Sequence, residues 1–272
     1  VSTKYQRTAL KAIEDIGTSV EVVTTDISDA AGVKKLLASL PRLRGIIHAA
    51  GVLADGMLIQ QSPESYEKVA GPKVRGAWHL HTQTQDRPLD FFVLFSSVAS
   101  IIGSPGQSNY AASNAFMDGL AHFRRRKGLA ATAVNWGPWA NVGMAASDLV
   151  MQRLLKDGWQ PMNANEGCSY MGQLLTIHDL PQAAVLPVDW MQFVANTPGA
   201  NKWSTLKHCI LEEQANLPVD DSAELAARKV KDAHPDQRID LIIFYLLKRI
   251  AQTLRVPATN LDEFAKPADL GF

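Results

Sequence analysis

The sequence of 272 residues contains little cysteine and no recognisable metal-ligand spacing. Its two cysteines, Cys168 and Cys209, stand alone and far apart, so we expect no metal site. We interpret them as reduced thiols, which are typical of a cytoplasmic protein, and a disulfide between them is the less favoured alternative. This low cysteine content argues against a small scaffold held together by disulfides.

The sequence also lacks a charge excess and a long apolar run. Its 27 basic residues are balanced by 27 acidic ones, whereas proteins that coat nucleic acids or membrane surfaces usually carry a basic excess. No segment approaches the ~20 apolar residues of a membrane span. The first residues, Val1 to Lys11, are polar and do not resemble a signal peptide. We therefore expect a protein that binds neither nucleic acid nor membrane.

Strand and helix signals alternate over the first two-thirds of the chain. Short apolar or β-branched runs predict strands at 20–25, 45–48, 91–95, 131–136 and 182–188. Between them, periodicity and capping residues predict helices at 28–40, from 62 to about 82, and at 109–126. Strands separated by helices imply right-handed crossovers between parallel neighbours. The pattern predicts an α/β fold with a doubly wound parallel sheet.

The composition changes after about Thr197. Residues 198–236 are rich in Pro, Asn, Asp, Glu and Ala, and we interpret them as a linker with one helical stretch near 222–231. Residues 237–254 carry apolar side chains with a 3.6-residue period, which predicts an amphipathic helix. The sequence thus predicts a helical C-terminal extension after the α/β domain.

Candidate site residues follow the predicted strands, because open parallel sheets bind ligands at the carboxyl ends of their strands. Ser97 follows one strand, and Tyr110 begins the next helix thirteen residues later. Asn114 lies four residues beyond Tyr110, on the same helical face. Lys73 lies upstream on the preceding crossover helix. The small residues at 49–51 would let a flat ring or a ribose approach the backbone.

Five motifs in order resemble the short-chain dehydrogenase/reductase superfamily and, more closely, the ketoreductase domain of a modular polyketide synthase. They are His48–Val52, Pro72–Gly76, Phe95–Ala99, Gly106–Ala115 and Asn135–Trp139. Most superfamily members place lysine four residues after the tyrosine. In this sequence that position is Asn114 and the lysine is Lys73, an exchange typical of synthase ketoreductases. The resemblance implies a Rossmann-like fold, incomplete at its N-terminus.

The resemblance implies a catalytic role for four of these residues in ketone reduction. Tyr110 would deliver a proton to the substrate oxygen, and Lys73 would stabilise the tyrosinate and lower the tyrosine pKa. Ser97 would donate a hydrogen bond to the substrate carbonyl, and Asn114 would orient Lys73 or a water. Each residue also has a structural alternative. Tyr110 could be a half-buried anchor and Ser97 a helix cap. Lys73 could be a solvated lysine and Asn114 a core amide.

Two further features favour structural roles. His48 lies on an apolar strand and is interpreted as a core histidine with satisfied hydrogen bonds rather than as a catalytic base. The cations at 124–127 are interpreted as the solvated end of a helix, with a phosphate-binding patch as the less favoured alternative.

The resemblance implies NADPH as the cofactor. Tyr110 and Lys73 would contact it, and so would residues from three other segments, namely Asp26, Ile27, Ala49, Ala50, Gly51, Gly137, Pro138 and Trp139. The family's first strand and its glycine-rich turn, which holds the pyrophosphate, would stand before Val1. We therefore expect the chain alone to bind NADPH weakly or not at all.

The resemblance also implies a stereochemical class. Leu53 and Asp55 match a fingerprint of B-type ketoreductases, as do Pro105 and Asn109 before the tyrosine. Ile102 stands where the opposing class has tryptophan, and Ala112 stands where the epimerising subtype has proline. This pattern implies a D-configured 3-hydroxyacyl product without epimerisation. The alternative is that these residues only pack loops.

The remaining segments extend the resemblance. Residues 143–160 resemble the family's mobile lid, with an ordinary surface helix as an equal alternative. The stretch from 237 to 272 resembles the opening of an acyl carrier protein. We thus predict a ketoreductase domain at 1–197, a linker at 198–236 and the start of a carrier protein at 237–272.

The leading hypothesis is an enzyme that reduces a phosphopantetheine-tethered 3-oxoacyl substrate on an acyl carrier protein, in contact with other polyketide synthase domains. One alternative is a non-catalytic structural or interaction segment of a synthase that cannot hold the cofactor. The other is a free-standing dehydrogenase acting on small molecules, which the exchange between Lys73 and Asn114 and the carrier-like tail oppose.

Overall fold

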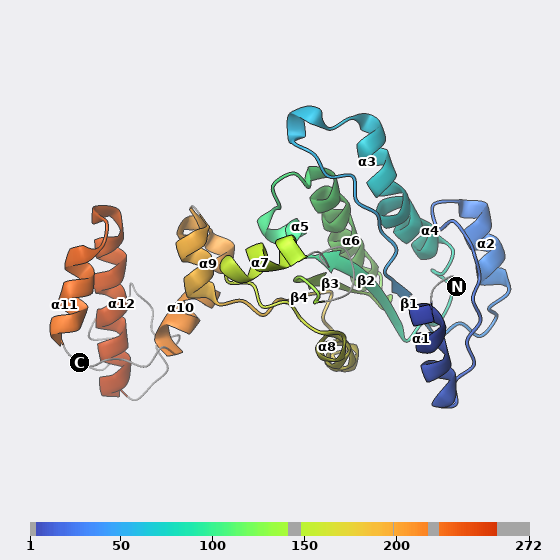
Figure 1. Cartoon of the computed structure of the whole chain (residues 1–272). Helices are drawn as coiled ribbons and strands as arrows, with labels where there is room; N and C mark the ends of the chain where they lie inside the picture. Colours follow the sequence, from blue (N-terminus) through green and yellow to red (C-terminus); the bar gives the residue numbers. More distant parts are fainter. Residues whose placement is uncertain (1–3, 141–147, 198, 217–222, 255–272) are drawn as a thin grey trace. The chain divides into compact units, whose positions relative to one another are not determined.

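The computed structural model describes residues 4–140, 148–197, 199–216 and 223–254 of the chain (Figure 1). It divides into two compact units. The first contains residues 1–137 and 165–185, and the second contains residues 138–164 and 186–272. Each unit is described by itself, and the predicted boundaries of the reductase, linker and carrier regions stay predictions.

The first unit is built on a parallel four-stranded sheet. Its strands are β1 (Gly45–His48), β2 (Phe91–Ser97), β3 (Thr132–Trp136) and β4 (Gln182–Val185), in that order across the sheet. Gly45 pairs with Phe91 and Val93 pairs with Thr132. All three neighbouring pairs are parallel, so the predicted α/β fold with a parallel, Rossmann-like sheet is confirmed.

Helices connect these strands and lie on both sides of them. In Figure 1, α6 lies on one side of the sheet and α8 on the other. The helices of this unit are α1 (Lys4–Asp15), α2 (Ala30–Ala38), α3 (Pro63–Ala70), α4 (Gly76–Thr82), α5 (Ala99–Ile102), α6 (Ser108–Arg126) and α8 (Ala164–Thr176). Asp29 caps α2 and Ser62 caps α3 in a reciprocal capping box, as their positions in the sequence predict.

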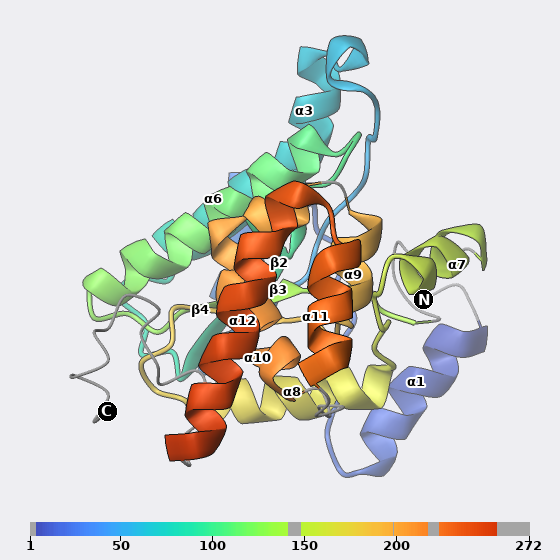
Figure 2. The same ribbon diagram turned by 90° about the vertical axis from the view of Figure 1, so that its left-hand side faces the viewer.

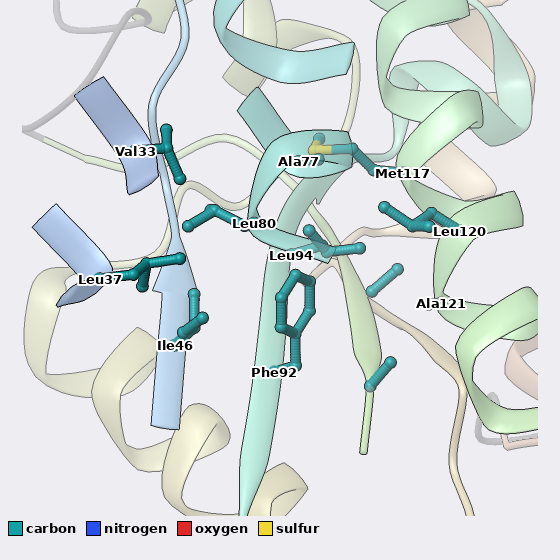
Figure 3. Packing of buried hydrophobic residues seen from close by; sticks show 12 residues of the cluster. Val33, Leu37, Ile46, Ala77, Leu80, Phe92, Leu94, Met117, Leu120 and Ala121 are labelled. Atoms are coloured by element: carbon teal, nitrogen blue, oxygen red, sulfur yellow. The ribbon is translucent and has the colours of Figure 1, made fainter. Parts of the chain in front are cut away.

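The core of the first unit lies between the sheet and helices α2, α4 and α6 (Figure 3). It is filled by apolar side chains of the three helices and of strands β1 to β3. The labelled members are Val33, Leu37, Ile46, Ala77, Leu80, Phe92, Leu94, Met117, Leu120 and Ala121. Burial of this apolar surface stabilises the sheet and the helices that carry the candidate site residues.

The strand predicted at 20–25 is absent, and this prediction is wrong. The segment has no regular structure, and Val22 and Val23 are 56% and 50% exposed. β-branched residues favour strands only where a neighbouring strand accepts their backbone hydrogen bonds. In the described sheet, β1 is an edge strand paired only with β2, so no strand stands next to this segment.

The expected solvated helix end at 124–127 is also wrong for one residue. Arg124 is 1% exposed, and its guanidinium carbon lies 3.9 Å from the centre of the Phe92 ring. Its Nε donates to the backbone oxygen of Ala130 at 3.0 Å. The helix carries this residue on its inner face, where cation–π contact and backbone hydrogen bonds replace water. Arg126 and Lys127 are exposed, as expected.

The second unit is helical. It contains α7 (Asp148–Lys156), α9 (Trp190–Asn196), α10 (Lys207–Asn216), α11 (Ala223–Asp232) and α12 (Pro235–Leu254). The helices α11 and α12 pack side by side as a hairpin (Figure 2). Both correspond to helices that the sequence predicts at 222–231 and 237–254. Helix α10 lies within residues 198–236, the stretch that the sequence predicts to be a linker.

An aromatic cluster holds part of the second unit together. The Phe193 ring packs edge-on against Trp159, Trp190 and Trp203, with centroid distances of 5.4, 5.8 and 6.2 Å. Such edge-to-face pairs add stabilisation beyond the buried area. The predicted lid at 143–160 falls partly on residues 141–147, which lie outside the described residues. Its remainder forms α7, so both the lid and the surface-helix interpretation stay open.

Candidate active site

Lys73 and Asn114 meet in the interior of the first unit. Lys73 lies on a turn of π-helix, η2 (Gly71–Arg75), and is 3% exposed, while Asn114 on α6 is fully buried. The ammonium Nζ donates to Asn114 Oδ1 at 3.0 Å and to the backbone oxygen of Phe95 at 3.1 Å. A single π-turn within a helical segment is frequently found at functional sites. Here the turn carries the lysine into the site.

Tyr110 and Ser97 lie next to this contact between Lys73 and Asn114. The centre of the Tyr110 ring lies 5.1 Å from Lys73 Nζ. Burial raises the pKa of Tyr110, hydrogen bonds with the Ser97 and Asn114 side chains oppose this, and the charge of Asp55 adds to the rise. The structure therefore brings all four predicted catalytic side chains together.

The expected lowering of the tyrosine pKa is wrong. Tyr110 is 9% exposed, and the loss of solvation of its charged form outweighs the hydrogen bonds that stabilise it. Lys73 lies beside the face of the ring, and the pKa of Tyr110 stays above its ordinary value in this environment. At neutral pH the side chain is a protonated phenol, which is the form that a proton donor requires.

Burial also lowers the pKa of Lys73, to about 8, while the charge of Asp118 acts in the opposite direction. An ammonium in a low-dielectric site loses its hydration, and a nearby carboxylate returns part of that stabilisation. Lys73 is thus still largely protonated at pH 7. Lys73 loses its charge in a pH range where a lysine in water keeps its proton.

His48 ends β1 and is buried, as predicted, and its ring hydrogen-bonds with the backbone of Pro72 and Lys73, but it is only partly satisfied. Its Nε2 has no hydrogen-bond partner among the described residues. Burial and the charge of Lys73 lower its pKa to about 4, so the ring is neutral near pH 7. The prediction of a satisfied core histidine is wrong in this respect, because β1 places the ring against the Lys73 turn. A built Cβ on Gly76 would lie 3.4 Å from its Cε1.

The residues of the predicted stereochemical fingerprint gather around the start of α6. Asn109 Nδ2 donates to the backbone oxygen of Ala54 at 2.8 Å, and Asn109 Oδ1 accepts from the Tyr110 amide at 2.7 Å. The Asp55 carboxylate accepts from Gln107 Nε2 at 2.9 Å. Leu53 packs against the small apolar cluster that contains Tyr110.

Pro105 is exposed in the loop before α6. A backbone hydrogen bond joins this loop to the loop that contains Asp55. The Gly56 amide donates to the Gly106 oxygen at 2.8 Å. Both loops therefore form one border of the site. Their role in stereochemistry stays a prediction.

Three of the predicted cofactor residues lie directly after β1. Ala49, Ala50 and Gly51 are exposed. A Cβ built on Gly51 would lie 3.0 Å from Lys73 Cε, so this backbone passes close to the lysine.

The other predicted cofactor residues are more dispersed. Asp26 is exposed and accepts a hydrogen bond from the Ser28 amide at 2.8 Å, and Ile27 packs against the core. Gly137 follows β3, and its amide donates to the Val185 oxygen at 2.8 Å. Pro138 and Trp139 belong to the second unit, where the Met162 amide donates to the Pro138 oxygen at 3.0 Å.

Several polar residues of the site were not singled out in the sequence. Gln61 Nε2 donates to the oxygens of Ala54 and Gly56, and its Oε1 accepts from Asn109. No local pattern marks this residue. Asp118 does carry a signal, since it continues the four-residue spacing of Tyr110 and Asn114 along one helix face.

The described residues contain no group of three metal-ligating side chains, and none of their helices is long and apolar enough to cross a bilayer. Both cysteines are free thiols, Cys168 exposed and Cys209 half-buried.

Comparison with known proteins identifies the family to which this fold belongs. The parallel sheet with its covering helices defines a Rossmann-like α/β domain, and the family model of the KR domain matches residues 1–141. Polyketide synthase GfsB of Streptomyces halstedii is 42% identical over 180 residues, which cover 65% of this chain and 3% of that protein. The phenolphthiocerol synthesis polyketide synthase type I Pks15/1 of Mycobacterium marinum is 34% identical over 275 residues, which cover 96% of this chain and 13% of that protein.

Among solved structures, an A1-type ketoreductase superposes with a TM-score of 0.69 at 35% identity, over 75% of this chain and 44% of that one. The chain thus spans a small part of the curated relatives and less than half of this structural relative. The chain belongs to the KR family, the ketoreductase domains of modular polyketide synthases.

Proposed function

We propose that this chain carries the proton-donating centre of an NADPH-dependent ketoreductase. It would reduce a 3-oxoacyl thioester, tethered to an acyl carrier protein through phosphopantetheine, to the D-configured 3-hydroxyacyl thioester. The observation that carries the proposal is the contact between the two exchanged residues. Lys73 and Asn114 come from different helices and form a 3.0 Å hydrogen bond beside Tyr110.

The described residues fit a nicotinamide cofactor at the edge of β1. Ala49 to Gly51 expose a backbone with little side chain, and Gly51 closely approaches Lys73. Ala49, Ala50 and Gly51 would hold the ribose side of the cofactor, and Tyr110 and Lys73 would contact it near the reacting carbonyl. When bound, the reduced nicotinamide supplies the hydride.

Ser97 and Tyr110 would act on the substrate oxygen. Ser97 Oγ accepts a hydrogen bond from the Ala99 amide at 3.2 Å, which directs its own hydrogen away from the helix. That hydrogen can be donated to the carbonyl as negative charge develops on its oxygen. Tyr110, kept protonated by its raised pKa, gives its proton to the same oxygen.

Lys73 and Asn114 would stabilise the tyrosinate that this transfer leaves. The ammonium lies beside the Tyr110 ring, and Asn114 and the Phe95 oxygen fix its position. Because the site is buried, an ammonium near a new phenolate stabilises it more than it would in water.

The D-configuration is proposed from the fingerprint residues Leu53, Asp55, Pro105 and Asn109. The structural relative described above is an A1-type enzyme, so similarity of fold does not distinguish the stereochemical classes. The support is local: Gln107 fixes Asp55, and Asn109 anchors the start of the Tyr110 helix to Ala54.

The test is a Tyr110→Phe substitution in the longest natural polypeptide that contains this chain. NADPH oxidation with a 3-oxoacyl thioester should fall at least ~100-fold, because proton transfer by a positioned side chain contributes about that much. Tyr66→Phe is the matched control, since it removes a phenol whose hydroxyl donates to Ser108 Oγ at 2.8 Å, outside the candidate catalytic set, and it should retain activity. Retained turnover in Tyr110→Phe contradicts the proposed role. Chiral analysis of the wild-type product completes the test, and an L-configured product contradicts the B-type assignment.

A further inference from the structure

A buried polar network lies next to the four candidate catalytic residues. Asp118 is 8% exposed and lies on α6, one turn beyond Asn114. Ser100 Oγ lies 2.6 Å from one of its carboxylate oxygens. Asn135 Nδ2 lies 3.0 and 2.9 Å from the two oxygens. A buried carboxylate is costly unless hydrogen bonds and a nearby positive charge compensate for its lost hydration.

The same two neighbours of Asp118 reach the backbone of Ser97. Ser100 Oγ lies 2.8 Å from the Ser97 oxygen, and Asn135 Nδ2 lies 3.3 Å from it. A hydroxyl group has one hydrogen and an amide nitrogen has two, so the carboxylate and the Ser97 oxygen share few donors. The orientation of Ser97 therefore depends on how the carboxylate engages Ser100 and Asn135.

The network also reaches Asn114 on α6, the residue that binds Lys73. Asn135 Nδ2 lies 3.1 Å from Ser96 Oγ, and Ser96 Oγ donates to the backbone oxygen of Asn114 at 3.3 Å. Asn114 is the residue whose side chain accepts from Lys73. One set of hydrogen bonds thus joins Asp118 to the strand end with Ser97 and to the lysine partner.

Charge gives Asp118 a second link to Lys73. Three described groups face the ammonium or act on it electrostatically: His48 from β1, and Tyr110 and Asp118 from α6. The pKa of His48 is lowered to about 4 and that of Tyr110 is raised, so both are neutral near pH 7. Asp118 is the group of these three whose charge opposes the effect of burial on Lys73.

We propose that Asp118 is a positioning residue of this site, which fixes Ser97 through Ser100 and Asn135 and supplies a negative charge that stabilises the Lys73 ammonium. The proposal rests on the proposed function, because it assigns Asp118 a role toward that same catalytic set. Asp118 touches neither substrate nor cofactor in this scheme and acts only through its neighbours.

The first test uses the wild-type full chain and needs no turnover. With ¹³C in the lysine ε-carbons and the aspartate carboxyl carbons, NMR titration follows both groups. Lys73 should titrate near pH 8, and the Asp118 carboxyl signal should shift at the same pH, because the two charges interact. The shift of the Asp118 signal near pH 8 should vanish in Lys73→Met, and its loss also shows that it is caused by Lys73. An Asp118 signal that does not respond to Lys73 overturns the proposal.

The second test compares two substitutions. Asp118→Asn keeps the shape and removes the charge, whereas Ser100→Ala removes one hydrogen bond and keeps the charge. Asp118→Asn should lower the pKa of Lys73 by about one unit, and Ser100→Ala should leave it unchanged. An unchanged Lys73 in Asp118→Asn, or an equal shift in both variants, overturns the proposal. If Asp118→Asn fails to fold, the wild-type titration decides alone.

Activity supplies a third readout in the longest natural polypeptide that contains the chain. Asp118→Asn should lower kcat about fivefold at pH 8, with KM nearly unchanged, and should move the alkaline fall in kcat to lower pH by the shift seen in the NMR titration. A lower kcat with an unmoved pH profile shows a purely structural role and overturns the proposal. Because the titrations need no substrate, they stand even if Tyr110→Phe disproves the reductase function.

Discussion

At the scale of single residues, the site is governed by the cost of burying charge. Lys73 lies among protein atoms, and its ammonium is held by one amide oxygen and one backbone oxygen. Burial lowers its pKa to about 8, and Asp118 limits the effect. Tyr110 shows the same physics with the opposite sign, because burial raises the pKa of a phenol. Both side chains are therefore protonated near neutral pH, as the proposed proton transfer requires.

The pKa of Lys73 predicts the alkaline limit of activity. Wild-type kcat should fall as pH rises through about 8, because Lys73 loses the proton that stabilises the tyrosinate. Lys73→Arg keeps a charge at all accessible pH values, so its lower activity should show no such fall between pH 7 and about 9.5. The measurement is kcat against pH for both proteins. A fall near pH 8 that persists in Lys73→Arg assigns it to another group and contradicts the prediction.

At the scale of elements, α6 organises the site. Tyr110, Asn114 and Asp118 recur every four residues, so they share one face of the helix above β2 and β3. Each has a different partner: the Ser97 side chain, the Lys73 ammonium and the Asn135 amide. A rotation or shift of this helix would disturb all three contacts at once. Asn109, which ties the start of α6 to the loop at Ala54, opposes such a shift.

Alanine substitutions at two glycines test how closely the surrounding backbone and side chains are packed. Gly158 in the second unit has φ +87°, and a Cβ there would lie 2.6 Å from the Asp189 oxygen and 2.7 Å from the Phe193 nitrogen. Gly158→Ala should lower the free energy of unfolding by at least ~2 kcal/mol, because both backbone conformation and space exclude a methyl group.

Gly119 is the matched control, since it lies within α6 and a Cβ there meets nothing within 4 Å. Gly119→Ala should raise stability by up to ~1 kcal/mol. Urea unfolding followed by tryptophan fluorescence measures both effects. Equal stability of Gly158→Ala and wild type would disprove the described packing.

At the scale of the whole molecule, buried histidines link stability to pH. His48 has a folded-state pKa of about 4, below its ordinary value of 6.5. The unfolded chain therefore binds more protons below pH 6.5, and stability falls as the pH falls from 6.5 towards 4. The pKa of His81 is also lowered to about 4, by burial and by Arg124, and acts in the same direction.

Replacement of His48 should reduce this sensitivity. Between pH 7 and 4.5, the free energy of unfolding of wild type should drop by about 2 kcal/mol more than that of His48→Gln. His178→Gln, at an exposed position, should behave as wild type. Urea denaturation at the two pH values gives the comparison. Identical acid losses in wild type and His48→Gln would refute the linkage.

Sequence patterns predicted the regular elements well wherever local signals and burial agreed. Strands β1 to β4 and helices α2, α3, α6, α11 and α12 lie where periodicity and capping residues placed them. The failures share one cause. The segment at 20–25 has strand propensity without a neighbouring strand, and Arg124 has a terminal position but an inward face. The local sequence predicts neither the absence of a neighbouring strand at 20–25 nor the buried surroundings of Arg124.

The sequence by itself determined the alternation of strands and helices, the motif order and the identity of Ser97, Lys73, Tyr110 and Asn114 as a candidate set. It could do so because spacing along a strand or helix fixes which side chains share a face. Only the tertiary structure decided that Asp118 and Asn135 support that set, that Tyr110 has a raised pKa and that His48 Nε2 lacks a partner. Those properties depend on desolvation and on contacts between segments that are distant along the chain, such as Lys73 and Asn114, which are 41 residues apart. Chain order does not encode these distances directly.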